Sequence, residues 1–391
     1  MAETSDVVII GAGIMGCSVA FHLAQSGMKV TVLEKNTIGA GSTGRSSAII
    51  RTHYSNEITA RMALHSLRVF QDFEATVGGE CEFRCTGWVA LASAADRAGL
   101  EANVQLQQRV GIDTRLISKE ELRDLVPAID CSDMVAAAYE PESGYADPHL
   151  TVSAYADAAR RHGADIRVNT EVTGIRFHGG RVVGVDTPDG TYAAPLVVNC
   201  AGPWGARVAA MAGVEIPINS CRIQVAVFHR PVEYREPHPV IMDFILGSYC
   251  RSEIGELTLV GSIDPSEADA VVDPDDYPEH MDDEFLSEVG ELFVRRCPPM
   301  EFSETRGGYS GLYAVTPDWH PIVDEIPAGS GCFVCSGFSG HGFKLAPAVG
   351  VMISDMLGDD ADPLFDPTAF RLDRFATDDL VRGTYAYSIT G

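Results

Sequence analysis

A glycine pattern near the start of the chain constrains the fold most strongly. An apolar, β-branched run at Val7–Ile10 leads into the motif GAGIMG at 11–16, after which apolar residues recur at helical spacing. A second apolar run at Val30–Leu33 ends on Glu34, an acid 23 residues after the first glycine. The order strand, glycine turn, helix, strand predicts a parallel βαβ unit of about thirty residues.

Each glycine of this motif has a physical role. Gly11 allows the tight turn, Gly13 lets a pyrophosphate approach the backbone at the positive end of the helix, and Gly16 permits close packing of helix on strand. Glu34 can accept hydrogen bonds from ribose hydroxyls. Because the glycines follow a strand and open a helix, the motif indicates a bound dinucleotide and not merely a glycine-rich turn.

Composition excludes several classes of function. The 391 residues include 55 Asp and Glu against 29 Lys and Arg, a formal charge of −26 that repels phosphate backbones and anionic lipids. We therefore expect no nucleic-acid partner and no peripheral membrane binding. The ten cysteines are too sparse and irregular for a disulfide scaffold or a zinc site, so no metal is expected, and GCFVC at 331–335 indicates a buried strand.

The length and composition of the chain predict an ordinary folded protein of two to three domains. The first apolar run lacks the features of a signal peptide and is too interrupted to span a bilayer, so we expect a cytoplasmic, soluble protein. Pro188, Asp189 and Gly190 predict a hairpin turn. The segment 264–284 holds ten acidic residues and no Lys or Arg, which predicts a solvated loop. Helical patterns occupy 55–74, 96–110, 149–162, 285–296 and 346–357, with strand patterns at 165–202 and 216–261.

Two further segments favour FAD over NAD. AGSTGRSSAIIR at 40–51 follows the second strand with small residues and two arginines, which would let the chain run beneath a flat ring system. GFSGHGFK at 337–344 is a second glycine-rich turn opening a helix, whose positive end could face electron-rich atoms of a flavin.

These motifs, together with ESGYADP at 142–148, VVNCAGPW at 197–204 and GLYAVTPD at 311–318, cover nearly the whole chain. In this order they resemble the FAD-dependent amine oxidases of the D-amino acid oxidase and sarcosine oxidase family, and GFSGHGFK is particularly similar to the sarcosine oxidase branch. The resemblance implies an α/β fold with a Rossmann-like, discontinuous FAD-binding domain of the GR2 type and a substrate-binding domain with a mostly antiparallel β-sheet. We expect the FAD domain at 1–80, 145–213 and 305–391, and the substrate domain at 81–144 and 214–304.

The resemblance and the motifs together place the FAD contacts. Some relatives tether FAD through a cysteine where this chain has Gly311, and others through a histidine where it has Arg45, so we predict non-covalent FAD. The expected FAD contacts are Gly11, Gly13, Ile14, Met15, Gly16, Glu34, Lys35, Gly41, Ser42, Thr43, Arg45, Ser46, Val172, Ala201, Gly202, Trp204, Gly311, Gly337, Gly340, His341, Gly342, Phe343 and Lys344.

The substrate site follows from the same resemblance. Arg51 and Lys344 match the residues that hold a substrate carboxylate, and Lys344 is one of four lysines in the chain, although a structural ion pair is the alternative for it. Tyr313 matches a tyrosine of the substrate cavity and Tyr249 may match another; either could instead be a core aromatic residue. The histidines expected near the site, as bases or as structural residues, are His53 and His341.

The resulting functional hypothesis is oxidation of a secondary or N-methylated amino acid by hydride transfer to the flavin, followed by hydrolysis of the imine. One alternative is a 2-hydroxy acid or D-amino acid dehydrogenase, and another is a flavoprotein subunit or assembly factor without activity. Oxidases of the family tend to carry a lysine where Thr258 is the best match, which casts doubt on O2 as the electron acceptor. The sequence leaves open the substrate side chain, the acceptor, and whether the chain forms a homo-oligomer or joins a larger oxidase complex.

Overall fold

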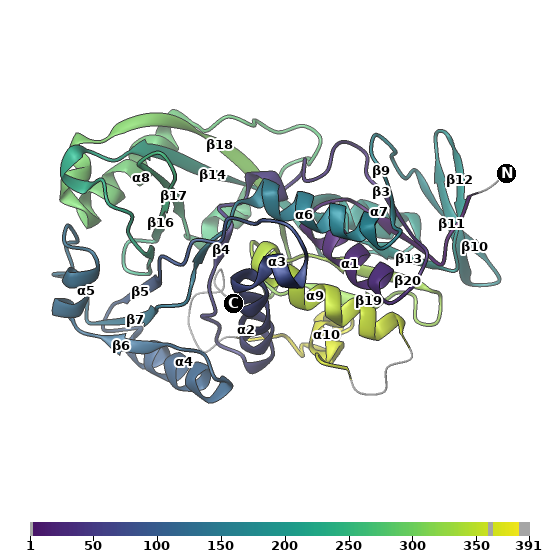
Figure 1. Cartoon of the computed structure of the whole chain (residues 1–391), viewed down its shortest axis with the longest axis horizontal. Helices are drawn as coiled ribbons and strands as arrows, with labels where there is room; N and C mark the ends of the chain where they lie inside the picture. Colours follow the sequence, from purple (N-terminus) through teal and green to yellow (C-terminus); the bar gives the residue numbers. More distant parts are fainter. Residues whose placement is uncertain (1–2, 359–362, 383–391) are drawn as a thin grey trace.

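The computed structural model describes residues 3–358 and 363–382, and two large sheets lie side by side along its long axis (Figure 1). The first sheet has six strands, of which the central ones are parallel and buried on both faces, as their runs of Val, Ile and Leu require. In sheet order the strands are β19 (Ile322–Glu325), β20 (Cys332–Ser336), β13 (Leu196–Asn199), β2 (Val7–Ile10), β3 (Val30–Leu33) and β9 (Asp165–Arg167).

Helices cover one face of this sheet, and a short helix with a smaller sheet covers the other. The helices share one apolar core with β2, β3 and β20, and they are α1 (Ile14–Gln25), α2 (Glu57–Gln71), α6 (Pro148–Arg161) and α9 (Gly342–Leu357). The opposite face packs on α7 (Gly205–Met211) and on a four-stranded sheet of β1 (Glu3–Thr4), β12 (Gly190–Ala193), β11 (Arg181–Thr187) and β10 (Gly174–His178). Helices on both sides of a mostly parallel sheet make this the Rossmann-like half.

The second sheet has eight strands, and its neighbours run antiparallel apart from the parallel pair β15 and β5. Its strands are β18 (Glu304–Val315), β14 (Asn219–His229), β17 (Leu257–Ser262), β16 (Ser248–Glu253), β15 (Val240–Asp243), β5 (Trp88–Ala92), β7 (Ala136–Glu140) and β6 (Arg115–Ile117). The helices of this half are α4 (Arg97–Val110), α5 (Lys119–Leu125) and α8 (Asp283–Arg296), and residues of α5 and α8 cover one face of the sheet. The expected fold class is confirmed.

The secondary structure follows the sequence patterns closely. The five helices expected from periodicity are present as α2, α4, α6, α8 and α9, and the predicted hairpin joins β11 to β12. The remaining α-helices and β-strands are short: α3 (Phe73–Thr76), α10 (Arg374–Thr377), and the paired strands β4 (Ile49–Ile50) and β8 (Gly144–Tyr145).

The domain limits stay a proposal, with one adjustment. Strand β18 pairs with β14 in the eight-stranded sheet, so we propose that the third FAD-domain segment begins after Val315 and not at 305. Of that expected segment, residues 359–362 and 383–391 lie outside the described residues.

Two kinds of feature are absent from the described residues. None of the helices there has the length and apolar character needed to cross a membrane. Nowhere within 3–358 and 363–382 do three His, Cys, Asp or Glu side chains gather as a metal site requires.

Candidate active site

A cavity of about 340 Å³ lies between the two large sheets. It is lined by the ends of β2, α1 and α9, by the segment 40–51, and by Met242, Tyr249 and Tyr313 of the antiparallel sheet. This volume falls in the range of pockets that hold small molecules. Of the residues expected at the site, all of which belong to the described chain, Gly16 and His53 do not line the cavity, whereas the others do.

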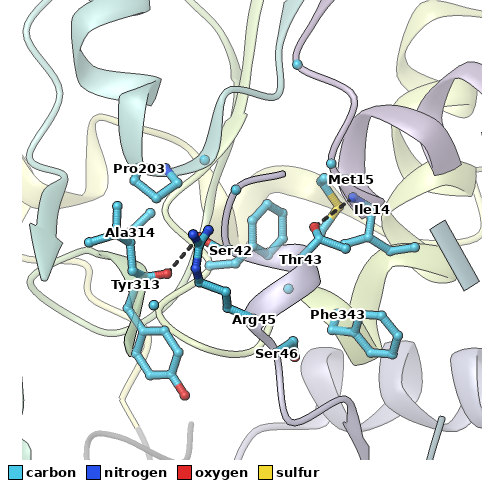
Figure 2. A pocket seen from close by; sticks show the side chains of 18 of the residues that line it. Ile14, Met15, Ser42, Thr43, Arg45, Ser46, Pro203, Tyr313, Ala314 and Phe343 are labelled. Atoms are coloured by element: carbon cyan, nitrogen blue, oxygen red, sulfur yellow. Dashed lines mark hydrogen bonds between the residues drawn. The ribbon is translucent and has the colours of Figure 1, made fainter. Parts of the chain in front are cut away.

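The first end of the cavity is a backbone cradle at the start of α1. Gly11 has φ +101°, and a β-carbon there would lie 2.8 Å from the carbonyl oxygen of Cys200. A β-carbon at Gly16 would lie 1.9 Å from the carbonyl oxygen of Gly11, so helix and strand touch at this point. Beside the cradle, the Ile14 N–H donates a hydrogen bond to Thr43 Oγ1 over 3.0 Å, as Figure 2 shows. The helix therefore presents its positive end to the cavity.

Glu34 fixes a carboxylate at the same end. Its Oε2 accepts a hydrogen bond from the Ala12 N–H at 2.8 Å, and its Oε1 accepts one from the Asn36 N–H at 2.8 Å. The side chain lies just beyond β3, next to the cradle, where the pattern of a dinucleotide site requires an acceptor for ribose hydroxyls.

A second helix begins at the cavity, 328 residues along the chain from the first. Ser18 of α1 donates its hydroxyl to the Ala346 carbonyl of α9 over 2.7 Å, which holds the two helices together. Gly342, Phe343 and Lys344 of the first turn of α9 line the cavity, and this turn carries no acidic residue. Two positive helix ends thus meet around one space, an arrangement that favours an electron-rich ligand.

Two buried cations stand in the cavity wall. Arg51 is only 4% exposed and Lys344 only 7%. The Arg51 guanidinium lies 4.6 Å from the centre of the Tyr54 ring and donates to the His53 carbonyl. Burial, and then the nearby Arg51 charge, hold the pKa of Lys344 well below its ordinary value. An anion bound between them would relieve this repulsion.

His341 faces the same space as a neutral imidazole. Its Nδ1 shares a hydrogen bond with the Tyr54 hydroxyl at 3.1 Å, and its Nε2 has no hydrogen-bond partner among the described residues. Burial, followed by the charges of Lys344 and Arg51, lowers the pKa of His341 well below the ordinary value.

His53 lies elsewhere, contrary to expectation. Its ring packs 4.9 Å from the Trp88 ring, and its Nδ1 lies 3.7 Å from Glu140 Oε1. Burial and then Arg51 lower the pKa of His53 to about 3, which keeps the imidazole neutral. Since it does not line the cavity, His53 is not placed to act as a base on a ligand there.

The two expected tyrosines stand on the wall opposite the first helix. The Tyr249 hydroxyl shares a hydrogen bond with Ser47 Oγ at 2.7 Å, which ties β16 to the small-residue segment. Burial raises the pKa of both Tyr249 and Tyr313, so both phenols stay protonated. Neither is a core residue away from the cavity, because each lines it.

The acidic segment was expected as a solvated loop, but part of it is anchored across the cavity rim. We call residues 273–282 the acidic strap. Asp275 lines the cavity and accepts a hydrogen bond from Trp204 Nε1 at 2.9 Å, while it also pairs with Lys35 and, at 2.7 Å, with Arg207. Glu279 pairs with Arg45 at 2.7 Å. The strap thus joins the antiparallel half to the Rossmann-like half through charge.

A model for FAD dependent oxidoreductases matches residues 6–356 of the sequence. The chain belongs to this family. It is 29% identical to human mitochondrial sarcosine dehydrogenase over 90% of its length but spans 39% of that protein, and 28% identical to sarcosine oxidase subunit beta of Rhodobacter capsulatus, covering 95% of this chain and 88% of that one. The structure of L-proline dehydrogenase from P. horikoshii superimposes with a TM-score of 0.89 at 30% identity, covering 97% of this chain and 100% of that one.

The cavity of this oxidoreductase fits FAD. The glycine cradle would hold a pyrophosphate, Glu34 a ribose, and the start of α9 the electron-rich part of the flavin ring. Position 311, where some relatives carry a tethering cysteine, is a glycine in this chain. A β-carbon added there would lie 3.1 Å from the Arg45 side chain. Figure 2 shows Arg45 at the second tether position, beside Ser42, so neither position offers a thiol or an imidazole.

Thr258 does not take the place that the sequence suggested for it. Its hydroxyl lies 3.2 Å from both Arg230 Nη1 and His238 Nε2, and Thr258 is absent from the described lining of the cavity. The identity of this residue in the oxidoreductase therefore carries no information about the electron acceptor.

Sequence reasoning missed several residues that shape the site. Met242 lines the cavity from β15 and Asp275 from the strap, and Glu140 accepts a hydrogen bond from the N–H of Thr52, the residue after Arg51. The contact between Glu140 and Thr52 spans 88 residues of sequence and that between Lys35 and Asp275 spans 240. No local motif could have revealed them, although the density of acids in the strap was a visible signal.

Proposed function

We propose that this oxidoreductase oxidises the carbon–nitrogen bond of an amino acid whose amine is secondary or N-methylated. The observation that carries the proposal is the pair of buried cations, Arg51 and Lys344, in the wall of the FAD cavity. Lys344 takes part in none of the ion pairs of the described residues, and a buried charge is costly unless it is paired. A carboxylate is the anion that every amino acid supplies.

The chain's own residues bind and orient such a substrate. Arg51 and Lys344 would hold the carboxylate through charge-assisted hydrogen bonds, which are the stronger kind. Tyr249, Tyr313 and Met242 enclose the remainder of the cavity with ring and thioether surface, which excludes water from the substrate. Substrate orientation of this kind removes much of the entropic cost of reaction.

Proton movement needs little from the protein. The cations and the low polarity of the cavity favour an amine bound in its neutral form. His341, itself neutral, offers Nε2 as a hydrogen-bonding group in the same wall. When bound, FAD supplies the acceptor for a hydride from the carbon next to nitrogen. Water then hydrolyses the resulting imine.

The relatives support a secondary amine as substrate. The proteins named sarcosine dehydrogenase, sarcosine oxidase subunit beta and L-proline dehydrogenase are named for sarcosine and proline, which are both secondary amines with one carboxylate. A 2-hydroxy acid would instead require a general base at the cavity, and of the two candidate histidines only His341 lines it. A flavoprotein without activity would have no need of two buried cations in its cavity wall.

Anaerobic reduction of the bound flavin tests the proposal. The purified holoenzyme is mixed without oxygen with sarcosine, L-proline, D-alanine or lactate, and flavin absorption is followed. We expect bleaching by the secondary amines. Bleaching by lactate but by none of the amines would contradict the proposal, and no bleaching by any compound would favour a non-catalytic role. Repeating the reactive case with oxygen and with an artificial acceptor distinguishes an oxidase from a dehydrogenase.

Location and assembly stay predictions. We propose a cytoplasmic enzyme, while noting that the human relative is named as mitochondrial. The similarity to a protein named as a subunit supports a role within a larger complex as well as action alone. The mass of the purified native particle decides between these states.

A further inference from the structure

A buried tyrosine contacts His341 from behind the cavity wall. Tyr54 is 0% exposed and does not line the cavity, and its hydroxyl lies 3.1 Å from His341 Nδ1. The Arg51 guanidinium lies over the face of the same ring, 4.6 Å from the ring centre. One side chain outside the cavity therefore contacts two residues of its wall, Arg51 and His341.

The hydrogen bond between Tyr54 and His341 has a direction that fixes the tautomer of the imidazole. Burial raises the pKa of Tyr54 to about 12, so the hydroxyl keeps its proton. Among the described residues, His341 Nδ1 is the hydroxyl's one hydrogen-bond partner. If Nδ1 carried the proton of the ring, the phenol proton would be buried without an acceptor, which is costly. The hydroxyl therefore donates to Nδ1, and the neutral ring carries its own proton on Nε2.

The Nε2–H of His341 lacks an acceptor within the described protein. This nitrogen is buried, and it has no hydrogen-bond partner in residues 3–358 and 363–382. The turn that bears the ring is fixed, because the His341 backbone N–H donates to the Phe338 carbonyl over 2.7 Å and a β-carbon at Gly340 would lie 2.6 Å from the Tyr313 ring. Since His341 lines the cavity and its Nδ1 edge is engaged by Tyr54, the Nε2 edge is left for a ligand.

We propose that Tyr54 is a positioning residue that holds His341 as a neutral donor through Nε2–H, and that this donor binds an electron-rich oxygen of the ligand. The oxygen is a carbonyl of the flavin or the carboxylate of the substrate, which share the same acceptor chemistry. The ring nitrogen that could accept a proton is turned to Tyr54, so His341 is not available as the general base that a 2-hydroxy acid would need. The choice of the carboxylate rests on the proposed function, whereas the tautomer does not.

Nitrogen-15 NMR of the holoenzyme labelled at histidine reads the tautomer directly. The signals of His341 are those that disappear in His341→Leu. We expect the proton on Nε2 in the wild type and a larger share of Nδ1-protonated ring in Tyr54→Phe, because the phenol no longer donates to Nδ1. A proton on Nδ1 in the wild type would overturn the inference whatever the substrate proves to be, and so would an unchanged tautomer in Tyr54→Phe.

Two dissociation constants identify the accepting oxygen. FAD binding is measured by quenching of flavin fluorescence on titration of the apoprotein, and acetate binding by the perturbation of the flavin spectrum in the holoenzyme. Tyr54→Phe keeps the ring beside Arg51 but frees the imidazole, so one of the two constants should rise roughly three- to tenfold. A rise for FAD assigns a flavin carbonyl, and a rise for acetate assigns the carboxylate. No change in either constant would overturn the inference.

A double variant separates positioning from packing. If the hydroxyl acts through the imidazole, Tyr54→Phe should change neither constant further once His341→Leu is present. The same weakening in both backgrounds would show a merely structural role and overturn the inference. Tyr234→Phe, which removes a buried hydroxyl outside the cavity lining, is the matched control and should bind both ligands as the wild type does. A wild type that binds no acetate would count against the proposed function and leave the NMR result standing.

Discussion

Lys344 shows how much one residue can indicate at a candidate site. Lysine is rare in this acidic chain, and this one lies in the first turn of α9, buried beside Arg51 in the cavity wall. The alternative of a structural ion pair finds no support among the described residues, because none of the ion pairs found there contains Lys344. Its burial is explained most simply by an anion that arrives with the ligand.

The carboxylate assignment makes a kinetic prediction. Arg51→Met and Lys344→Met each remove a charge-assisted hydrogen bond worth about 1.5–3 kcal/mol, so each should lower kcat/KM roughly ten- to a hundredfold. Steady-state kinetics with FAD-saturated enzyme measure the effect. Lys119→Met, outside the cavity lining, is the control. Wild-type kinetics in both cavity variants would refute the assignment.

Two glycines of the first motif should respond differently to alanine. At Gly16 the new β-carbon would overlap the Gly11 carbonyl at 1.9 Å, and because that atom is backbone we expect a loss of about 3 kcal/mol, the upper end of the usual cost of overpacking, in the free energy of unfolding. At Gly13 it would meet Thr43 Oγ1 at 3.2 Å, which the fold can accommodate.

The measurements are urea unfolding of the apoprotein and titration with FAD. Gly13→Ala should unfold near the wild-type midpoint but bind FAD more weakly, because its β-carbon would fill part of the pyrophosphate cradle. A Gly16→Ala protein as stable as the wild type would show that helix and strand pack less closely than the structure has them.

At the scale of elements, the acidic strap connects the two halves of the molecule. It leaves the antiparallel half, crosses the rim of the cavity, and pairs with Lys35, Trp204 and Arg207 of the Rossmann-like half. Lys35 also lies 4.0 Å from the centre of the Trp204 ring. Several charges converging on Asp275 make this contact stronger than an isolated surface pair.

Removing a charge from the acidic strap should weaken the binding of FAD. Asp275→Asn removes the charge shared by Lys35 and Arg207, and we expect the dissociation constant for FAD to rise roughly three- to tenfold at low salt, with a smaller difference at high salt. Quenching of flavin fluorescence on titration of the apoprotein gives the constant. The neighbouring, exposed Asp276 makes none of these contacts, so Asp276→Asn should match the wild type. A salt-independent effect would argue against an electrostatic cause.

The elements themselves were predictable where their information is local. The βαβ unit, the helices and the β11–β12 hairpin follow from periodicity and turn residues within short windows. The pairing of β5 with β15 was not predictable, because it joins Trp88–Ala92 to Val240–Asp243 without any local signal. The same holds for β18, which the family pattern assigned to the FAD domain and which lies in the other sheet.

At the scale of the whole molecule, buried neutral histidines couple stability to pH. Burial lowers the pKa of His53 to about 3 and of His238 to about 4, from 6.5. Below about pH 6.5 the unfolded chain binds these protons and the folded protein does not. The free energy of unfolding therefore falls as the pH drops below 6.5, by about 1.4 kcal/mol per pH unit for each histidine.

Urea unfolding of the apoprotein at about pH 7.5 and about pH 5.5 measures this dependence. His238→Gln removes one such group and should reduce the loss between the two pH values. His178 is exposed on β10, so His178→Gln should leave the loss as in the wild type. Equal losses in all three proteins would mean that His238 takes up its proton in the folded state.

Those parts of the site that are formed by sequence motifs could be predicted. Glycine turns and helix starts are local, so residues 325 positions apart, such as Met15 and Gly340, could be placed at one cavity through the family resemblance. The direction in which a side chain points could not be predicted from the motifs. His53 is two residues from Arg51 yet turns toward Trp88, and Thr258 turns toward His238, because packing decides which face each residue takes.

The interleaving of the chain also sets an order of events during synthesis. Strand β20 and helix α9 complete the sheet and core begun by β2 and α1. The Ser18 hydroxyl cannot donate its hydrogen bond until Ala346 of α9 has been synthesised. A nascent chain that has not yet emerged to Leu357 lacks one wall of the cavity. Cofactor capture is consequently a late step, and a ribosome-bound chain arrested before α9 should expose the apolar side of α1 to chaperones instead of binding FAD.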